Sequence, residues 1–216
     1  MKKFHFEVFN KNQAEIFPKL DFLTKEKFYL AGGTALALYL GHRNSVDFDF
    51  YSQNHFDASS LYEKIKKIFK KKVKKTFSEK DTLYCYVGEI SLSFFWYQYP
   101  LIKPLKKLKG VSLASLEDIA AMKLIAIHHR PARRDYIDVF YLLKLFSLKE
   151  MFGFVKKKYP EFNQYLILRT LTYFDDLAEE DTKRAIKILD KKFSWEKAKK
   201  KIFEEVKKYQ LGMIRT

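Results

Sequence analysis

Asp47 and Asp49 are the residues whose types and spacing best suit chemistry. They alternate with Phe48 and Phe50 along the segment 45–52, which predicts a β-strand with both carboxylates on one face. Two like charges side by side on a strand repel each other unless something neutralises them. Mg²⁺ would do so, because it takes hard oxygen ligands from one or two carboxylates and from substrate phosphates. The alternative is a solvated strand whose polar residues face water.

A second feature is Gly32, Gly33 and Thr34, at an expected junction between a strand over 27–30 and a helix over 36–40. Paired glycines let a phosphate approach the backbone, and the start of a helix offers free N–H groups. Such glycine pairs also arise for steric reasons alone. The run becomes informative because the Asp strand follows it.

A third group lies in the second half of the chain. Lys123 falls within the apolar helical run 119–127, where its ammonium needs an anionic partner. Arg130 shares its helix face, and Asp135 and Asp138 are one turn apart on the next expected helix. This spacing fits either an anion-binding site or a salt-bridged helix hairpin.

The elements that must position these residues divide into two parts. Before residue 110 we expect a short helix over 12–23, strands over 83–87 and 90–97 joined by a tight turn at Gly88, and a small mixed sheet. A lysine-rich amphipathic helix is expected over 59–75. After the boundary the pattern is helical, with a capping box formed by Ser115 and Asp118. The later helices are expected over 115–129, 133–146, 150–160, 161–178, 180–192 and 194–210.

The composition narrows the classes of protein. The 216 residues are 47% hydrophobic, enough for a buried core, and the formal net charge of +16 favours polyanionic partners such as RNA or nucleotides. The single cysteine, Cys85, excludes an intramolecular disulfide framework and is expected to be a core residue. No apolar run reaches about 18 residues and no secretory signal is present, so we expect a cytoplasmic protein with no membrane segment.

The order of these features resembles a known family. The runs Ala31–Leu38 and Gly41–Phe50 look like the first two motifs of the AbiEii/AbiGii toxin family of nucleotidyltransferases. The run Asp118–Leu124 with Arg130 looks like its third motif, and Arg134–Asp138 looks like its fourth. The resemblance implies an α/β (α+β) fold, with a nucleotidyltransferase core over 1–110 followed by a helical domain over 111–216.

The resemblance also implies roles for particular residues. Asp47 and Asp49 would bind Mg²⁺ or Mn²⁺. A nucleoside triphosphate would be bound by the residues Gly32, Gly33, Thr34, Arg43, Ser45, Lys123 and Arg130. Asp135 or Asp138 would position Lys123 or activate the acceptor. Ser93 stands where many nucleotidyltransferases have a third carboxylate, so it would contribute only a weak oxygen ligand.

The resemblance finally implies a biological setting. The chain would move a nucleotidyl group to an RNA, such as a tRNA, or to a protein. It would be the toxin of a type IV toxin–antitoxin or abortive-infection pair in phage defence, with an antitoxin encoded nearby. Two alternatives remain open: a catalytically degenerate nucleotide or RNA binder with the same fold, and a basic RNA-binding protein whose Asp pair is only structural.

Overall fold

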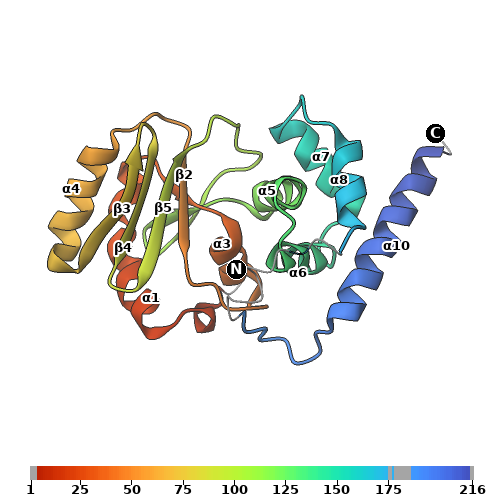
Figure 1. The fold of residues 1–216 in the computed structure, drawn as a ribbon, viewed down its shortest axis with the longest axis horizontal. Helices are drawn as coiled ribbons and strands as arrows, with labels where there is room; N and C mark the ends of the chain where they lie inside the picture. Colours follow the sequence, from red (N-terminus) through yellow and green to blue (C-terminus); the bar gives the residue numbers. More distant parts are fainter. Residues whose placement is uncertain (1–3, 175–176, 178–185, 215–216) are drawn as a thin grey trace. The chain divides into compact units, whose positions relative to one another are not determined.

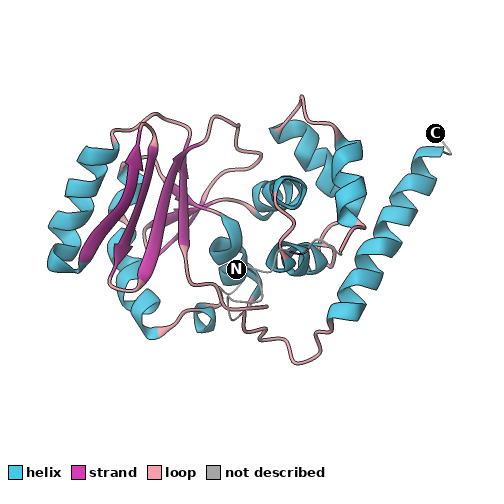
Figure 2. Cartoon of the chain, viewed as in Figure 1, coloured by secondary structure: helices cyan, strands magenta, loops and turns pink. Residues whose placement is uncertain are grey.

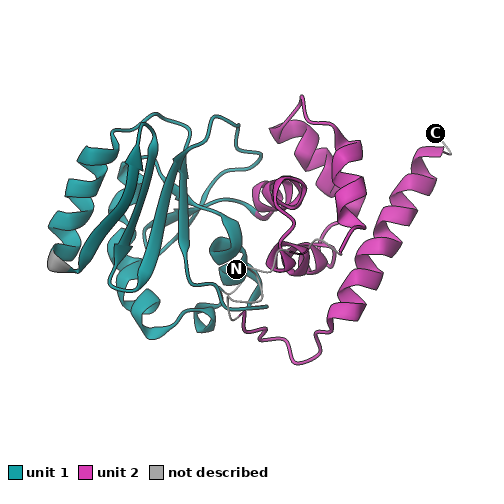
Figure 3. Cartoon of the chain, in the orientation of Figure 1, with its two compact units in different colours: residues 1–115 teal, residues 116–216 magenta. Residues whose placement is uncertain are grey.

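The computed structural model of the protein describes residues 4–174, 177 and 186–214. The chain divides into two units, residues 1–115 and residues 116–216 (Figure 3). The sequence placed the change in character near residue 110. The strands of the described chain belong to unit 1, and unit 2 is built mainly of helices (Figure 2).

Unit 1 is a mixed seven-stranded sheet with flanking helices (Figure 1), which confirms the predicted fold class. Its helical segments are η1 (Phe6–Val8), α1 (Lys11–Ile16), η2 (Phe17–Leu20), α2 (Phe22–Lys25), α3 (Gly32–Leu40), α4 (Ala58–Phe69) and η3 (Lys70–Lys72). Its strands are β1 (Tyr29–Leu30), β2 (Phe48–Ser52), β3 (Val73–Glu79), β4 (Thr82–Val87), β5 (Ile90–Trp96), β6 (Lys106–Leu108) and β7 (Val111–Leu113).

The strand order is β3-β4-β5-β2-β1-β7-β6, in which β2 pairs with β5 and β1 with β7 in parallel, and the other neighbours are antiparallel. The predicted hairpin between β4 and β5 is confirmed: Val87 is opposite Ile90, and Gly88 has a φ of +62°. The β6–β7 hairpin, which the sequence analysis missed, turns at Lys109 and Gly110, both with positive φ. Two successive residues with positive φ give the turn a twist that matches the right-handed twist of the flanking strands.

One face of the sheet forms the core of unit 1. Phe48, Phe50, Leu92 and Phe94 are fully buried there. The ring of Phe48 lies 5.9 Å from that of Phe17 in η2. Helix α4 covers the β3–β4 part of this face, because Lys75, in register with the buried Cys85, places its ammonium 5.1 Å from the Tyr62 ring of α4. The prediction that Cys85 is a core residue is confirmed.

Several predicted boundaries in unit 1 are wrong. Pro18, which lacks an N–H, interrupts the helix expected over 12–23, so η2 separates α1 from α2. The lysine-rich helix ends at Phe69, where Lys70 adopts a φ of +55°, and β3 begins at Val73. Strand β2 begins at Phe48 rather than at residue 45, and Val46 is 47% exposed.

Unit 2 contains α5 (Leu116–His129), α6 (Arg133–Leu142), α7 (Leu148–Lys158), α8 (Gln164–Leu171) and α10 (Trp195–Ile214). Helices α6 and α8 are therefore shorter than the predicted 133–146 and 161–178. Residues 186–192 of the helix expected over 180–192 are not helical, and 180–185 lie outside the described residues. The Ser147 hydroxyl and the Glu150 carboxylate form a capping box that begins α7.

A buried ion pair joins α5 to α7. Lys158 Nζ lies 2.8 Å from Asp118 Oδ1, and neither side chain is exposed. Burial lowers the pKa of Lys158, and the hydrogen bond and charge of Asp118 oppose that shift. The carboxylate of Asp118, expected to act in a capping box, thus pairs with a lysine.

Candidate active site

The two glycines and the Asp strand meet at the start of α3. Gly32 begins the helix with a φ of +66°, a conformation that favours glycine. A Cβ at this position would lie 3.2 Å from Asp49 Oδ2. The Ala31 N–H donates to the main-chain oxygen of Asp49 at 3.1 Å. The carboxylate of Asp49 therefore lies directly against the first residue of α3.

Gly33 lies against a basic side chain. A Cβ there would come within 2.5 Å of Arg43 Nη2, so a larger residue would displace the guanidinium. Arg43 is 3% exposed and donates from Nη1 to the main-chain oxygen of Asn44 at 2.8 Å. A buried guanidinium beside the start of a helix is suited to a phosphate oxygen.

Hydroxyl groups fix the loop that carries Arg43. The Thr34 hydroxyl lies 2.7 Å from Ser45 Oγ and within hydrogen-bonding distance of the main-chain oxygen of Asp47. Gln13, which the sequence analysis missed, donates from Nε2 to the Ser45 carbonyl at 2.7 Å. Thr34 is thus a positioning residue for the loop before β2.

The Asp pair has one direct neighbour in the sheet. Asp47 precedes β2 and Asp49 is its second residue, and both are partly exposed. Ser93 on β5 is in register with Asp49 and is 7% exposed. No group of three or more His, Cys, Asp or Glu side chains in the described chain could hold a metal ion. Two carboxylates and a hydroxyl form a hard-oxygen donor set, which fits Mg²⁺ whose other ligands come from a substrate and water.

Lys123, Asp135 and Asp138, three of the four remaining predicted site residues, form a second cluster, in unit 2. Lys123 Nζ lies 2.5 Å from Asp135 Oδ1 and 2.7 Å from Asp138 Oδ2, and all three side chains are at most 8% exposed. Arg130 is exposed just past the end of α5.

Lys158 is a buried charged residue of unit 2 that the sequence analysis did not single out. It belongs to a run of three lysines that resembles a solvated helix end. A signal was present, since Lys158 continues the spacing of the buried residues Met151, Phe152 and Val155 on α7.

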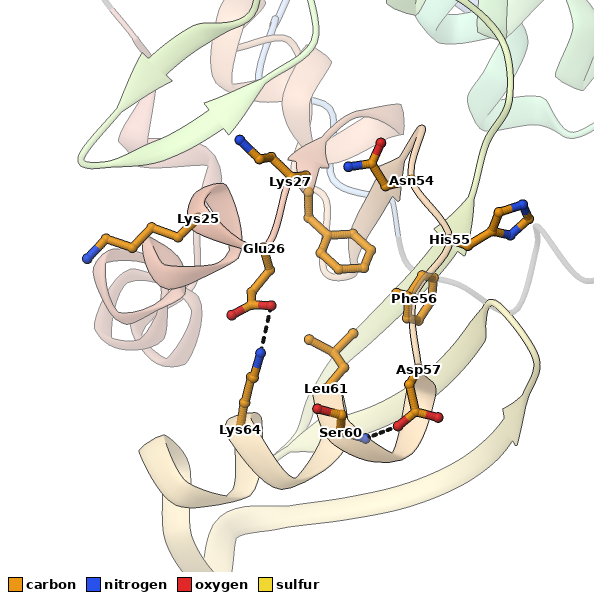
Figure 4. Close-up of a pocket in the computed structure, with 11 residues that line it drawn as sticks. Lys25, Glu26, Lys27, Asn54, His55, Phe56, Asp57, Ser60, Leu61 and Lys64 are labelled. Carbon is orange, nitrogen blue, oxygen red and sulfur yellow. Dashed lines mark hydrogen bonds and ion pairs between the residues drawn. The ribbon is translucent and has the colours of Figure 1, made fainter.

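A cavity in unit 1 is lined by residues other than the Asp pair. About 320 Å³ in volume, it is bounded by residues 25–28 and by the segment 54–57 that follows β2, whereas Asp49 lies near the start of β2 (Figure 4). Among the residues that line this cavity, Lys64 of α4 forms an ion pair with Glu26, with Nζ 2.8 Å from Oε2.

Comparison with known proteins gives the fold and the family. The family model of the nucleotidyl transferase AbiEii toxin, type IV toxin–antitoxin system, matches residues 20–211. An uncharacterized protein of Aquifex aeolicus is 40% identical over 159 residues, 71% of this chain and 76% of that protein.

Two solved structures from Helicobacter pylori share the fold. JHP933 is 18% identical with a TM-score of 0.58 over 95% of this chain and 97% of that chain. A proposed nucleotidyltransferase is also 18% identical, with a TM-score of 0.59 over 92% and 95%. Since the family model covers most of the sequence, the chain belongs to the AbiEii family of nucleotidyltransferase toxins of type IV toxin–antitoxin systems.

Proposed function

We propose that this protein transfers a nucleotidyl group from a nucleoside triphosphate to an RNA acceptor. The observation that carries the proposal is the close approach of Gly32 to Asp49 Oδ2, because it joins a phosphate-binding turn to a carboxylate pair. Membership of the AbiEii family supports the same reaction class. A protein acceptor is the alternative for the same chemistry.

Different residues of unit 1 would bind the metal ion and the phosphates. Asp47 and Asp49 would hold Mg²⁺ or Mn²⁺, which when bound supplies charge neutralisation for the triphosphate. The N–H groups of Gly33 and Thr34 and the Arg43 guanidinium would bind phosphate oxygens, and Ser45 would hold the loop in place.

The chemistry needs no covalent intermediate. The acceptor hydroxyl attacks the α-phosphorus and forms a new P–O bond while the P–O bond to pyrophosphate breaks. The hydroxyl proton passes to a base. Arg43 is suited to orient the phosphates for this in-line displacement, because its guanidinium is held by the Asn44 carbonyl.

Lys123, Asp135 and Asp138 keep the roles that the family resemblance implies, as proposals. Lys123 would contact the triphosphate, and one of its two carboxylate partners would hold it in position or accept the proton of the acceptor. The geometry of unit 2 supports the positioning role, because both carboxylates lie within 2.7 Å of the ammonium.

The family also suggests partners and a place of action. The type IV toxin–antitoxin assignment implies an antitoxin, and we propose that it is encoded nearby and that the pair acts in abortive infection. We place the reaction in the cytoplasm, where nucleoside triphosphates and RNA are available. In the part of the chain that the structure describes, no helix is both long and apolar enough to cross a membrane.

A catalytically degenerate nucleotide or RNA binder is the second candidate, and the Ser93 position favours it. With Ser93 beside Asp49, the donor set has two carboxylates where many nucleotidyltransferases have three. The two candidates share the fold and differ only in turnover.

One experiment separates these functions. The purified protein is incubated with each labelled nucleoside triphosphate, Mg²⁺ or Mn²⁺, and total RNA, with an Asp47→Asn, Asp49→Asn double variant as the control. Label in RNA that depends on the Asp pair supports the transferase, and label in protein alone supports a protein acceptor. A nucleotide-induced rise in melting temperature without any label supports the degenerate binder, since ligand at a hundred times Kd stabilises the folded state by about 2.7 kcal/mol.

A further inference from the structure

A cross-strand line of side chains leads from the candidate active site to the edge of the sheet. Asp49 is in register with Ser93, Ser93 with Tyr84, and Tyr84 with Phe77. Residues in register on neighbouring strands point to the same face, so all four lie on the face opposite the packed core. Three strand spacings separate Asp49 from Phe77, a span of about 14 Å.

The rings on this face form a continuous row. The Tyr84 ring lies 5.6 Å from that of Phe77 and 5.5 Å from that of Phe95, and Phe95 lies 5.4 Å from Tyr51. Phe77 is 43% exposed, and Tyr86, two residues along β4 on the same face, is 40% exposed. Phe77 and Tyr86 therefore present flat apolar surface to solvent, and Tyr84 and Phe95 are partly exposed beside them.

The edge strand beside the row is basic. Lys72, Lys74 and Lys80 are exposed at or beside β3, and Lys74 shares the face of Tyr86 because the two are in register. Glu79 is the acidic residue of β3. A partly exposed aromatic row with a cationic margin is complementary to a chain that has flat bases and a phosphate backbone.

We propose that this face, the aromatic row of Phe77, Tyr84, Phe95 and Tyr51, binds the single-stranded end of the acceptor RNA. Unstacked bases would stack on Tyr84 and Phe77, and Lys74 would contact the backbone. A duplex is excluded as the occupant, because its base faces are already stacked and sheet-borne aromatic rings recognise splayed bases. The inference rests on the proposed function for its direction, since Ser93 joins Tyr84 of the row to Asp49 across the strands.

The test measures binding of the full chain to a fluorescent single-stranded RNA about ten nucleotides long, followed by anisotropy. Phe77→Leu and Tyr84→Leu keep apolar bulk but remove the ring. Each is expected to raise Kd about fivefold or more, the range for removal of one base–aromatic stack. Tyr84→Phe keeps the ring and is expected to keep the affinity. Phe203→Leu on α10, where Phe203 is 55% exposed, is the matched control and should bind like wild type.

The outcomes separate this inference from the proposed function. RNA binding by the aromatic row is supported if Phe77→Leu and Tyr84→Leu both bind more weakly with unchanged melting temperatures, and if the wild type prefers the single strand to an RNA hairpin. This holds even if the wild type transfers no label. Unchanged affinity in both variants overturns it, as does equal binding of the hairpin or no RNA binding at all. A change in self-association or in antitoxin binding without a change in RNA affinity would also overturn it, and would make the face a protein interface.

Discussion

At the scale of single residues, the Asp pair gives the sharpest prediction. Asp47→Asn and Asp49→Asn are each expected to abolish nucleotidyl transfer while leaving the protein as stable as wild type, or more so, because a repulsion between neighbouring carboxylates is relieved. Transfer is measured with labelled nucleotide, and stability by urea unfolding.

Glu89→Gln supplies the control for loss of a carboxylate in the same unit. Glu89 lies exposed in the β4–β5 turn, so this variant should retain activity. Full activity in both Asp variants would mean that the metal site lies elsewhere.

Ser93 carries the second prediction. Because it is in register with Asp49, Ser93→Asp adds a third carboxylate to the donor set, and it is expected to tighten Mg²⁺ or Mn²⁺ binding in the absence of nucleotide. In the wild type, metal binding should be weak alone and strongly enhanced by a nucleoside triphosphate. Calorimetry measures both affinities.

Thr82→Asp is the comparison for added charge on the same sheet face. Thr82 is in register with Phe95, two pairs along the ladder from the pair of Tyr84 and Ser93. Equal metal affinity for wild type and Ser93→Asp would show that Ser93 is not a ligand.

At the scale of elements, the pair between α5 and α7 gives a stability prediction. Lys158→Met removes the cation of a buried ion pair with Asp118 and is expected to cost about 3 to 5 kcal/mol of unfolding free energy. Lys158→Met combined with Asp118→Leu should recover most of that loss, since an apolar pair replaces the ions. Lys157→Met, one residue earlier and exposed, should change the stability little. Equal effects of the two lysine substitutions would contradict the burial of Lys158.

Lys123 of α5 pairs with two carboxylates of α6, and its substitution can distinguish a structural role from a catalytic one. Lys123→Ala removes an ammonium that pairs with two buried carboxylates, so we expect the unfolding free energy to fall by about 3 to 5 kcal/mol, and adding Asp138→Asn should reduce the loss. If Lys123 also contacts the triphosphate, the variant will have a higher KM and a lower kcat. A lower melting temperature with unchanged kinetics would make Lys123 purely structural.

The sequence predicted the elements with clean periodicity and missed those without it. Strands β4 and β5 alternate regularly about Gly88 and were found. Strand β3 does not alternate, because a bulge between Lys75 and Phe77 shifts its register, so its lysines were assigned to the preceding helix. Strands β6 and β7 have three residues each, too few for a periodic signal.

The candidate site was predicted by residue type, and the contacts within it were not. The order of the glycine turn and the Asp strand pointed to Gly32 and Asp49, but their approach depends on tertiary packing. The spacing of Lys123, Asp135 and Asp138 allowed either an anion-binding site or a salt-bridged helix hairpin. In the structure, Lys123 pairs with both carboxylates. Lys158 shows the remaining difficulty: pairing with Asp118, 40 positions away, cannot be inferred from a run of lysines.

At the scale of the whole molecule, the net charge of +16 predicts RNA binding that weakens with salt. Of the lysines in the helix expected over 59–75, Lys66 lies on α4 and Lys74 lies on β3. Replacing Lys74 by Gln, on the face of the aromatic row, should reduce the slope of log affinity against log salt by about 0.7 to 0.9 for each RNA phosphate that is no longer neutralised. Replacing Lys66, exposed on α4, should change it less. The same slope for both variants and wild type would show that neither lysine meets the RNA backbone.

The one cysteine of the sequence has a kinetic use that its packing creates. Cys85 is buried in β4, and burial raises the pKa of its thiol to about 12, so a thiol reagent can trap it only when unit 1 opens. The rate of thiol modification therefore reports the rate at which unit 1 opens. Lys158→Met is expected to lower the stability of unit 2. It would raise the rate of Cys85 modification only if the two units unfold cooperatively.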